Sequence, residues 1–260
     1  MNNIFSGLEK FGLEEILKDT PKADWPSIEE PPLEEDINRF VWEKKFDCPC
    51  CKNHFTNWYP KEKRMRMVKL DLDLRPIYTP LDASFYDVIV CSLCGYAAPD
   101  FIFGKILPFQ KDIIYTEIAP HFKNIEYGPR YNVIHAIERY KLALLTTITK
   151  SSKKEGSSRE GEKGYLALKL SWFYKELEDE TQRHQFATMA MDSLQIAMAE
   201  EHPPIMGMNY DTLAYIMGAL AVYLDKREIA LQSLSKVIMS KSTSKQLKDM
   251  AMTLKEDIRK

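Results

Sequence analysis

Two cysteine pairs with the same spacing offer the clearest chemistry in this chain: Cys48 with Cys51, and Cys91 with Cys94. A gap of two residues closes a tight turn, here called a knuckle, that aims both thiolates at one point. Two facing knuckles supply four sulfur ligands in a tetrahedron, the arrangement that Zn²⁺ favours at structural sites. Gly95 follows the last cysteine and allows the backbone to curl back toward the sulfurs. We therefore predict that Cys48, Cys51, Cys91 and Cys94 bind one structural zinc ion.

Two further residues lie close to the first knuckle. Cys50 does not easily replace Cys51, because the knuckle turn closes around a two-residue gap, and we interpret His54 as a bystander. Four cysteine ligands leave no open coordination position for a catalytic water, so the metal is predicted to supply folding free energy rather than catalysis. Iron in a rubredoxin-like redox site is the less favoured alternative.

The segments before the cysteines differ from them in composition. Residues 4–18 carry apolar side chains at helical spacing, which predicts a short amphipathic helix that either docks on its own chain or binds a partner. Residues 20–38 are rich in proline and acidic residues, which predicts an extended linker.

The cysteine pairs themselves lie in a stretch that is predicted to be rich in β-structure. Residues 68–74 alternate strictly between apolar and charged side chains, as a half-buried strand does. Residues 86–90 predict a second strand, which runs directly into Cys91. Asp71 and Asp73 would share one face of the first strand, and we interpret them as partners in a structural ion pair rather than as a catalytic acid pair.

From about residue 130 the spacing of apolar residues becomes helical, and Ser151 to Gly164 is a polar loop. Gly218 and Ala230 are small residues that would let two antiparallel helices cross closely, as in a tetratricopeptide repeat. We predict helices at 165–178, 181–200, 209–224, 227–240 and 243–259.

The predicted fold class is α+β, with a small zinc-ribbon-like domain followed by an all-α, tetratricopeptide-like domain. The predicted divisions are a helix and linker at 1–38, the zinc-ribbon-like domain at 39–125 and the helical domain at 126–260.

A cluster of basic residues follows Trp58 and Tyr59 and predicts an alternative function for the β-rich region. In a zinc ribbon, lysine and arginine can neutralise phosphates while aromatic rings stack on bases. The net charge of the whole chain is −2, which excludes a basic nucleic-acid coat. Nucleic-acid binding is therefore the second choice, and its candidate residues are Lys61, Lys63, Arg64, Arg66 and Lys69.

Bulk properties exclude several other classes. No apolar run approaches the roughly 20 residues that span a bilayer, so no membrane association is predicted. The first residues lack the basic and apolar regions of a secretory signal, and cysteines in metal-type pairs indicate a reducing cytoplasm rather than a disulfide framework. The chain contains no phosphate-binding glycine loop, dinucleotide fingerprint, metalloprotease motif or hydrolase nucleophile elbow, so we predict that it is not an enzyme.

The sequence resembles an uncharacterised bacterial family, catalogued as a domain of unknown function. The resemblance implies an N-terminal zinc-ribbon-like region, C-terminal tetratricopeptide-like helices and a cytoplasmic setting, and it brings no activity. This chain departs from the family pattern in having Cys50 inside the first knuckle and Ser92 in place of proline. The stretches that carry the resemblance are Cys48-Pro49-x-Cys51 with Phe55, Asp71-Leu72-Asp73-Leu74-Arg75-Pro76-x-Tyr78, Tyr86-Asp87-Val88-x-Val90-Cys91-x-x-Cys94-Gly95-Tyr96-Ala97, Gly164-Tyr165-Leu166-x-Leu168 with Trp172, and Tyr215-x-x-Gly218 with Ala230.

Stacked helix pairs usually bind peptides or proteins on a curved surface. We therefore expect a cytoplasmic adaptor that binds a protein or peptide partner, or a second copy of itself, through an apolar groove. The residues expected to line this groove are Leu166, Leu170, Phe173, Tyr174, Tyr215 and Val222.

Overall fold

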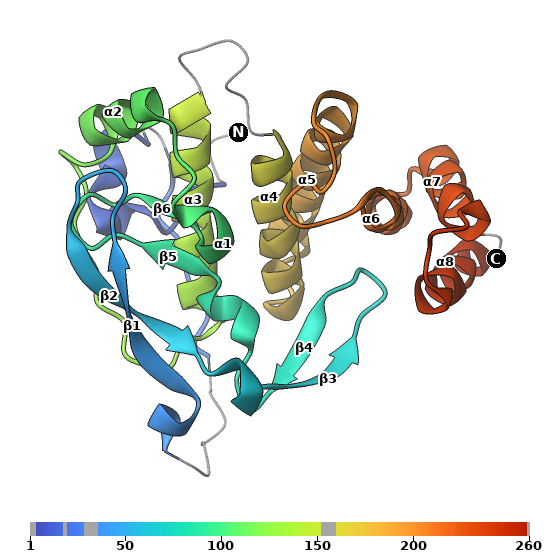
Figure 1. Cartoon of the computed structure of the whole chain (residues 1–260), viewed down its shortest axis with the longest axis horizontal. Helices are drawn as coiled ribbons and strands as arrows, with labels where there is room; N and C mark the ends of the chain where they lie inside the picture. The colour runs from blue at the N-terminus through green and yellow to red at the C-terminus, as the bar shows by residue number, and fades with distance from the viewer. Residues whose placement is uncertain (1–3, 18–19, 29–35, 152–159, 259–260) are drawn as a thin grey trace. The chain divides into compact units, whose positions relative to one another are not determined.

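The computed structural model describes residues 4–17, 20–28, 36–151 and 160–258. The chain forms two compact units, which are described separately. Unit 1 consists of Met1–Val68 and Tyr78–Ser158, and unit 2 consists of Lys69–Ile77 and Arg159–Lys260. Small sheets with few helices, followed by a helical region, confirm the predicted α+β class (Figure 1).

Not every predicted segment falls within the described residues. Residues 29–35 of the expected acidic linker and residues 152–159 of the expected polar loop lie outside them, and residues 20–28 form no regular secondary structure. The loop prediction is wrong at residues 160–164, which already belong to helix α4 (Glu160–Glu176). The division at 38/39 and 125/126 stays a prediction. The helices that the structure describes are all too short or too polar to cross a membrane.

Unit 1 contains two antiparallel hairpins, and each is closed by one cysteine knuckle. Strand β1 (Val41–Asp47) pairs with β2 (His54–Pro60), so the first knuckle connects them. Strand β5 (Val88–Val90) pairs with β6 (Ala97–Pro99) around the second knuckle. The predicted strand that runs into Cys91 is therefore present, in a shorter form.

Three helices complete unit 1. Helices α1 (Asp100–Phe103) and α2 (Pro108–Glu117) lie in the region that was predicted to be rich in β-structure. Helix α3 (Val133–Ser151) packs on both β5 and β6. Their contact is partly polar, because Thr146 of α3 donates a hydrogen bond to the Ala97 carbonyl at 2.6 Å.

The N-terminal segment docks on unit 1 but does not form the predicted amphipathic helix. It forms two 3₁₀ turns, Glu9–Phe11 and Leu13–Glu15, because Gly12 between them adopts a left-handed conformation with φ of 76°. Phe11 is buried, and its carbonyl accepts a hydrogen bond from the Lys123 backbone at 2.7 Å. Of the two expectations for this segment, the structure corresponds to docking on its own chain.

Unit 2 is a series of helices joined by short turns, in which α4 lies against α5, α6 against α7 and α7 against α8. The observed helices agree closely with the predicted ones. Their bounds are α4 Glu160–Glu176, α5 Glu180–Glu200, α6 Tyr210–Tyr223, α7 Arg227–Met239 and α8 Lys245–Asp257.

Glycine allows close helix approach in two of these pairs. A Cβ atom on Gly218 of α6 would lie 2.6 Å from Leu234 of α7. A Cβ atom on Gly164 of α4 would lie 2.7 Å from Leu194 of α5. Real side chains do not approach so closely, so each glycine leaves room for the leucine opposite.

The predicted strand at 68–74 is wrong in its second half. Strand β3 (Arg66–Leu70) pairs with β4 (Pro76–Thr79), and Asp71 to Leu74 form the turn between them. Leu74 adopts a positive φ of 64°, which a regular strand does not contain.

The charged side chains of this turn bind helix α4 instead of alternating across a strand. Lys175 Nζ lies 3.0 Å from Asp71 and 3.1 Å from Asp73. Arg75 donates to the Trp172 carbonyl at 2.8 Å and pairs with Glu176. Asp71 also pairs with Lys69, so the two aspartates do form a structural ion pair, mainly with a lysine that is distant in sequence. We call this arrangement the 71–75 clasp.

Candidate metal centre

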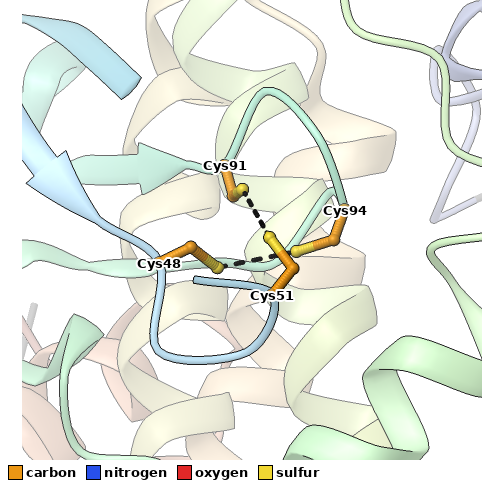
Figure 2. Close-up of side chains that lie close together, drawn as sticks. All are labelled: Cys48, Cys51, Cys91 and Cys94. Atoms are coloured by element: carbon orange, nitrogen blue, oxygen red, sulfur yellow. Dashed lines mark hydrogen bonds between the residues drawn. The ribbon is translucent and has the colours of Figure 1, made fainter. Parts of the chain in front are cut away.

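The structure brings Cys48, Cys51, Cys91 and Cys94 into one cluster. Their four sulfur atoms all lie within 4.8 Å of one another, and Figure 2 shows them converging from two loops. The Sγ atoms of Cys48 and Cys94 are 3.6 Å apart, as are those of Cys51 and Cys91. All of these cysteines are free thiols.

The first knuckle is closed by backbone hydrogen bonds around Cys48. Its amide donates to the Asn53 carbonyl at 2.9 Å, and its carbonyl accepts from the Lys52 amide at 3.0 Å. Lys52 has a φ of 64°, a left-handed conformation that side chains with a Cβ atom rarely adopt.

The second knuckle repeats this pattern. The Cys91 amide donates to the Tyr96 carbonyl at 2.9 Å, and its carbonyl accepts from the Gly95 amide at 3.1 Å. Gly95 has a φ of 71° at the position equivalent to Lys52. The predicted role of Gly95 in the turn is thus explained by its backbone conformation.

Two contacts from α3 and β2 hold the second knuckle in place. Asn57 of β2 donates to the Val90 carbonyl at 3.1 Å, directly before Cys91. Arg139 of α3 donates to the Val88 carbonyl and to the Asn57 side chain, both at 2.6 Å. Two carbonyls of strand β5, those of Val88 and Val90, are therefore bound by one Arg139–Asn57 pair close to the point where the strand delivers Cys91.

The sulfur geometry fits a tetrahedral metal ion. A regular tetrahedron with metal–sulfur bonds of about 2.3 Å has sulfur–sulfur edges of about 3.8 Å, close to the 3.6 Å contacts in the structure. A disulfide would instead require about 2.05 Å. Cys48, Cys91 and Cys94 are at most 1% exposed, so the cluster could hold a metal with little access for water.

The electrostatics of the cluster also favour a cation. Hydrogen bonds from Cys50, Cys91 and Cys94 lower the pKa of the Cys48 thiol, so Cys48 is the cysteine that carries a negative charge most readily. Hydrogen bonding to Cys48, with burial, raises the pKa of Cys91 to about 12, and the same causes raise the pKa of Cys94. Several buried thiolates repel one another unless a positive ion joins them.

Neither neighbouring candidate ligand belongs to the cluster. His54 is exposed, and its Nδ1 lies 2.5 Å from Asp47, with which it forms a surface pair. Cys50 is partly buried, and its interaction with Cys48 together with burial raises its pKa, which favours the unreactive thiol.

The residues predicted to line a partner groove are part of the interior of unit 2. Leu166, Leu170, Phe173, Tyr174 and Tyr215 are all at most 2% exposed. Val222 is half-buried and packs against the core cluster that contains Tyr215.

The open groove is therefore not present in the described chain, because these side chains have partners within unit 2. Tyr174 stacks on Phe186 with ring centroids 5.4 Å apart, and the Tyr215 hydroxyl donates to the Leu72 carbonyl at 2.7 Å. The apolar residues of α4 lie on all sides of the helix, a pattern typical of a buried helix rather than of a surface groove.

The predicted basic residues divide into two groups. Lys61 donates to the Asn38 carbonyl at 2.7 Å, and Lys69 pairs with Asp71 at 2.6 Å. Lys63, Arg64 and Arg66 are exposed and have no ion partner in the part of the chain that the structure describes. The last three are the ones available to an anionic partner.

Two hairpins that place four cysteines around a common point, in a chain whose other half is helical, define an α+β protein with a four-cysteine site that could hold a metal ion. A family profile described as an uncharacterized protein conserved in bacteria (DUF2225) matches residues 41–258, so the chain belongs to this family. The resemblance inferred from the sequence is thereby confirmed. No curated protein and no solved structure matches the chain.

The metal centre predicts different effects for two adjacent cysteines. Replacing Cys51 by serine removes one ligand, so we expect metal content to fall below one ion per chain and the free energy of unfolding to fall by roughly 4 kcal/mol or more. Cys50→Ser is the matched control, and we expect it to keep one ion and to change stability by less than about 1 kcal/mol. Elemental mass spectrometry and denaturant unfolding measure both quantities. Equal metal loss in the two variants would contradict the ligand assignment.

The paired turns predict effects of opposite sign at equivalent positions. Lys52→Gly removes the strain of a left-handed residue with a Cβ atom, which is about 1–2 kcal/mol. Glycine also loses more chain entropy on folding, which costs about 0.5–1 kcal/mol. We therefore expect the free energy of unfolding to rise by about 0.5–1 kcal/mol. Gly95→Ala introduces the same strain, and its Cβ would lie 2.5 Å from Phe122. We expect it to lose about 2 kcal/mol or more. The free energy of unfolding of the metal-loaded proteins tests both signs.

Proposed function

We propose that this protein is a non-enzymatic adaptor of the bacterial cytoplasm, stabilised by one structural zinc ion. The observation that carries the proposal is the four-sulfur cluster, in which every ligand position of a tetrahedral ion is taken by cysteine. A catalytic metal needs an open position for water or substrate, and this cluster leaves none. Free thiols in metal-type pairs are consistent with a reducing compartment.

Zinc suits this cluster better than iron for a physical reason. Zn²⁺ has no redox chemistry and no geometric preference from its d-electrons, so its role is to hold two loops together. Such an ion would add to the side-chain hydrogen bonds that already join the two hairpins, Asn53 to Ser92 and Asn57 to the Val90 carbonyl. A colourless purified protein with stoichiometric zinc supports this assignment, whereas a red protein with a visible absorption band supports the rubredoxin-like alternative.

The partner surface of such an adaptor would consist of exposed apolar side chains rather than of the buried residues of α4 and α6. Unit 1 exposes Phe101 and Tyr115 on its helices, and unit 2 exposes Tyr210 and Met239. Met239 is the most exposed of these side chains, at 76%. These residues suit a protein or peptide partner, including a second copy of the chain.

Affinity capture of the tagged protein from its own cells, with and without nuclease, tests the proposal. We expect one discrete protein in the eluate, in stoichiometric amount, which persists after nuclease treatment. Tyr115→Lys and Met239→Lys serve as matched variants, because each places a charge on an exposed position of one unit without disturbing a core. Capture that is unchanged in both variants, or that yields no stoichiometric protein, would count against the adaptor.

A second candidate function rests on the three unpaired cations Lys63, Arg64 and Arg66. They lie within six residues of the end of β2, on a 3₁₀ turn (Glu62–Arg64) and the start of β3. Their partner would be the backbone of a nucleic acid, which attracts exposed lysine and arginine without sequence preference. The aromatic part of this prediction is weaker, because Tyr59 is engaged with Asp100 through a 2.8 Å hydrogen bond.

Salt dependence tests this second candidate. If the cations bind duplex DNA, log Kobs should fall steeply with log salt concentration, and removing one phosphate-binding cation should flatten the slope by about 0.9. The variant with Lys63, Arg64 and Arg66 all changed to glutamine should therefore lose most of the binding. Lys45→Gln is a control that removes one exposed lysine outside this cluster. Binding that is absent in the unmodified protein, or unchanged in the triple variant, would exclude this function.

A further inference from the structure

A cavity of about 380 Å³ lies in unit 1 beside the metal centre. Its walls come from the start of β2, from Val90 and Ser92 around the second knuckle, and from residues 124–127. Tyr131 and Arg139 complete the lining. This volume lies within the roughly 300–1,000 Å³ that is typical of pockets for small molecules.

Arg139 is an unusual residue to find in such a wall. It is only 5% exposed, although arginine is charged at every accessible pH and is rarely buried without a paired carboxylate. Its guanidinium lies over the Tyr131 ring, 4.8 Å from the centroid. Both of its hydrogen bonds to protein leave from Nη2 and end on neutral oxygens, those of Asn57 and Val88.

The rest of the Arg139 guanidinium is unsatisfied. Its Nε has no hydrogen-bond partner in the described chain, and no carboxylate there pairs with it. A buried charge without a counter-ion costs several kcal/mol in a protein interior. An anion in the cavity would supply the missing negative charge.

The acidic groups nearby do not take this role. Glu138, the neighbour of Arg139 in the chain, lies 2.6 Å from Lys10 and accepts a hydrogen bond from Tyr127 at 2.5 Å, and burial raises its pKa. Glu43 and Glu126 are lining residues, but both are exposed to solvent. The positive charge is thus buried, whereas the negative charges of the lining are in water, where they are screened.

We propose that this cavity is a binding site for a small organic oxyanion, with Arg139 as the residue that recognises the carboxylate or phosphate group. Both Nη2 hydrogens already bind Asn57 and Val88, so the guanidinium would bind either group through Nη1, whose N–H groups have no acceptor in the described chain. Trp58 and Tyr127 line the same cavity and offer aromatic surface to the body of the ligand. The ligand is therefore an acid that carries a flat, apolar or aromatic body.

The metal centre supports one wall of this site. Asn53 follows the first knuckle and donates to Ser92 inside the second knuckle at 3.4 Å, and both residues line the cavity. A metal ion bound by the two knuckles would therefore hold Asn53 and Ser92 in place without contacting the ligand itself. The site does not depend on the adaptor function, because it requires only the folded unit 1.

Binding is tested by NMR on the full-length, metal-loaded protein, with the Arg139 Nε–Hε resonance as the sensor. The probes are phenyl phosphate and benzoate, with benzyl alcohol as the neutral control and benzylammonium as the cationic control. We expect a saturable shift with at least one oxyanion and none with either control. A response to phenyl phosphate alone identifies a phosphate ligand, and a response to benzoate alone identifies a carboxylate.

Two variants separate ligand recognition from folding. Arg139→Gln removes the sensor group, so its binding is followed through the backbone amide resonances of Asn57 and Ser92, which line the cavity. It should weaken binding by about 10- to 100-fold, the loss expected for a charge-assisted hydrogen bond. Because Arg139 also holds β5, Thr56→Phe is the second variant: it leaves the guanidinium in place and fills the cavity from an exposed position on β2. Denaturant unfolding and NMR line shapes report their folding.

Arg66→Gln, which removes an exposed arginine outside the cavity, should leave binding unchanged. The proposal is overturned if neither oxyanion gives a saturable shift. It is also overturned if benzyl alcohol binds as tightly as the anions, or if a folded Thr56→Phe protein retains full affinity. None of these outcomes affects the capture of a protein partner. The oxyanion site and the adaptor function can therefore be disproved independently of each other.

Discussion

Four sulfur atoms in one buried cluster cannot all carry negative charge unless a cation joins them, and the architecture of unit 1 follows from this constraint. Each knuckle must present two sulfurs, which requires a left-handed residue in each turn, Lys52 and Gly95. Each turn joins the two strands of one antiparallel hairpin. Asn57 and helix α3 hold the strands of the second hairpin. A metal ion bound by all four cysteines would therefore add its binding free energy to the folding free energy of both hairpins.

In unit 2, segments that are distant in sequence are joined by helix packing and by ion pairs rather than by a cysteine cluster. Its helices carry the core, with glycines opposite leucines where two pairs approach most closely. The 71–75 clasp then uses charge rather than apolar area, since Lys175 and Arg75 bind groups on the opposite segment. Networks that combine several partly buried charges and backbone carbonyls are more specific in geometry than isolated surface pairs. This accounts for the alternating acidic and apolar residues of the 71–75 segment, which do not follow a strand.

Local patterns predicted much of this structure, and residues that act over long distances were missed. The cysteine spacing was sufficient to pick out the four cysteines that the structure brings together, and apolar periodicity placed the described helices of unit 2 to within five residues. The left-handed Gly12 interrupted a helix that side-chain spacing predicted. The groove residues had the right periodicity for a helix, but periodicity does not say which face is covered. Arg139 is 82 positions from its partner Asn57, so no local signal could connect them.

The interleaved order of the two units has a consequence for synthesis on the ribosome. The segment Lys69–Ile77 emerges long before the helices with which it forms unit 2. Its contacts with Trp172, Lys175 and Tyr215 can therefore form only after these residues have been translated. The cysteine hairpins on either side of it can bring their four thiols together before that. The helical unit can complete its core only by capturing a loop that is anchored at both ends. A fragment that begins at Arg159 would lack this loop, so the helical unit cannot be separated from the metal-binding unit by a single cut in the chain.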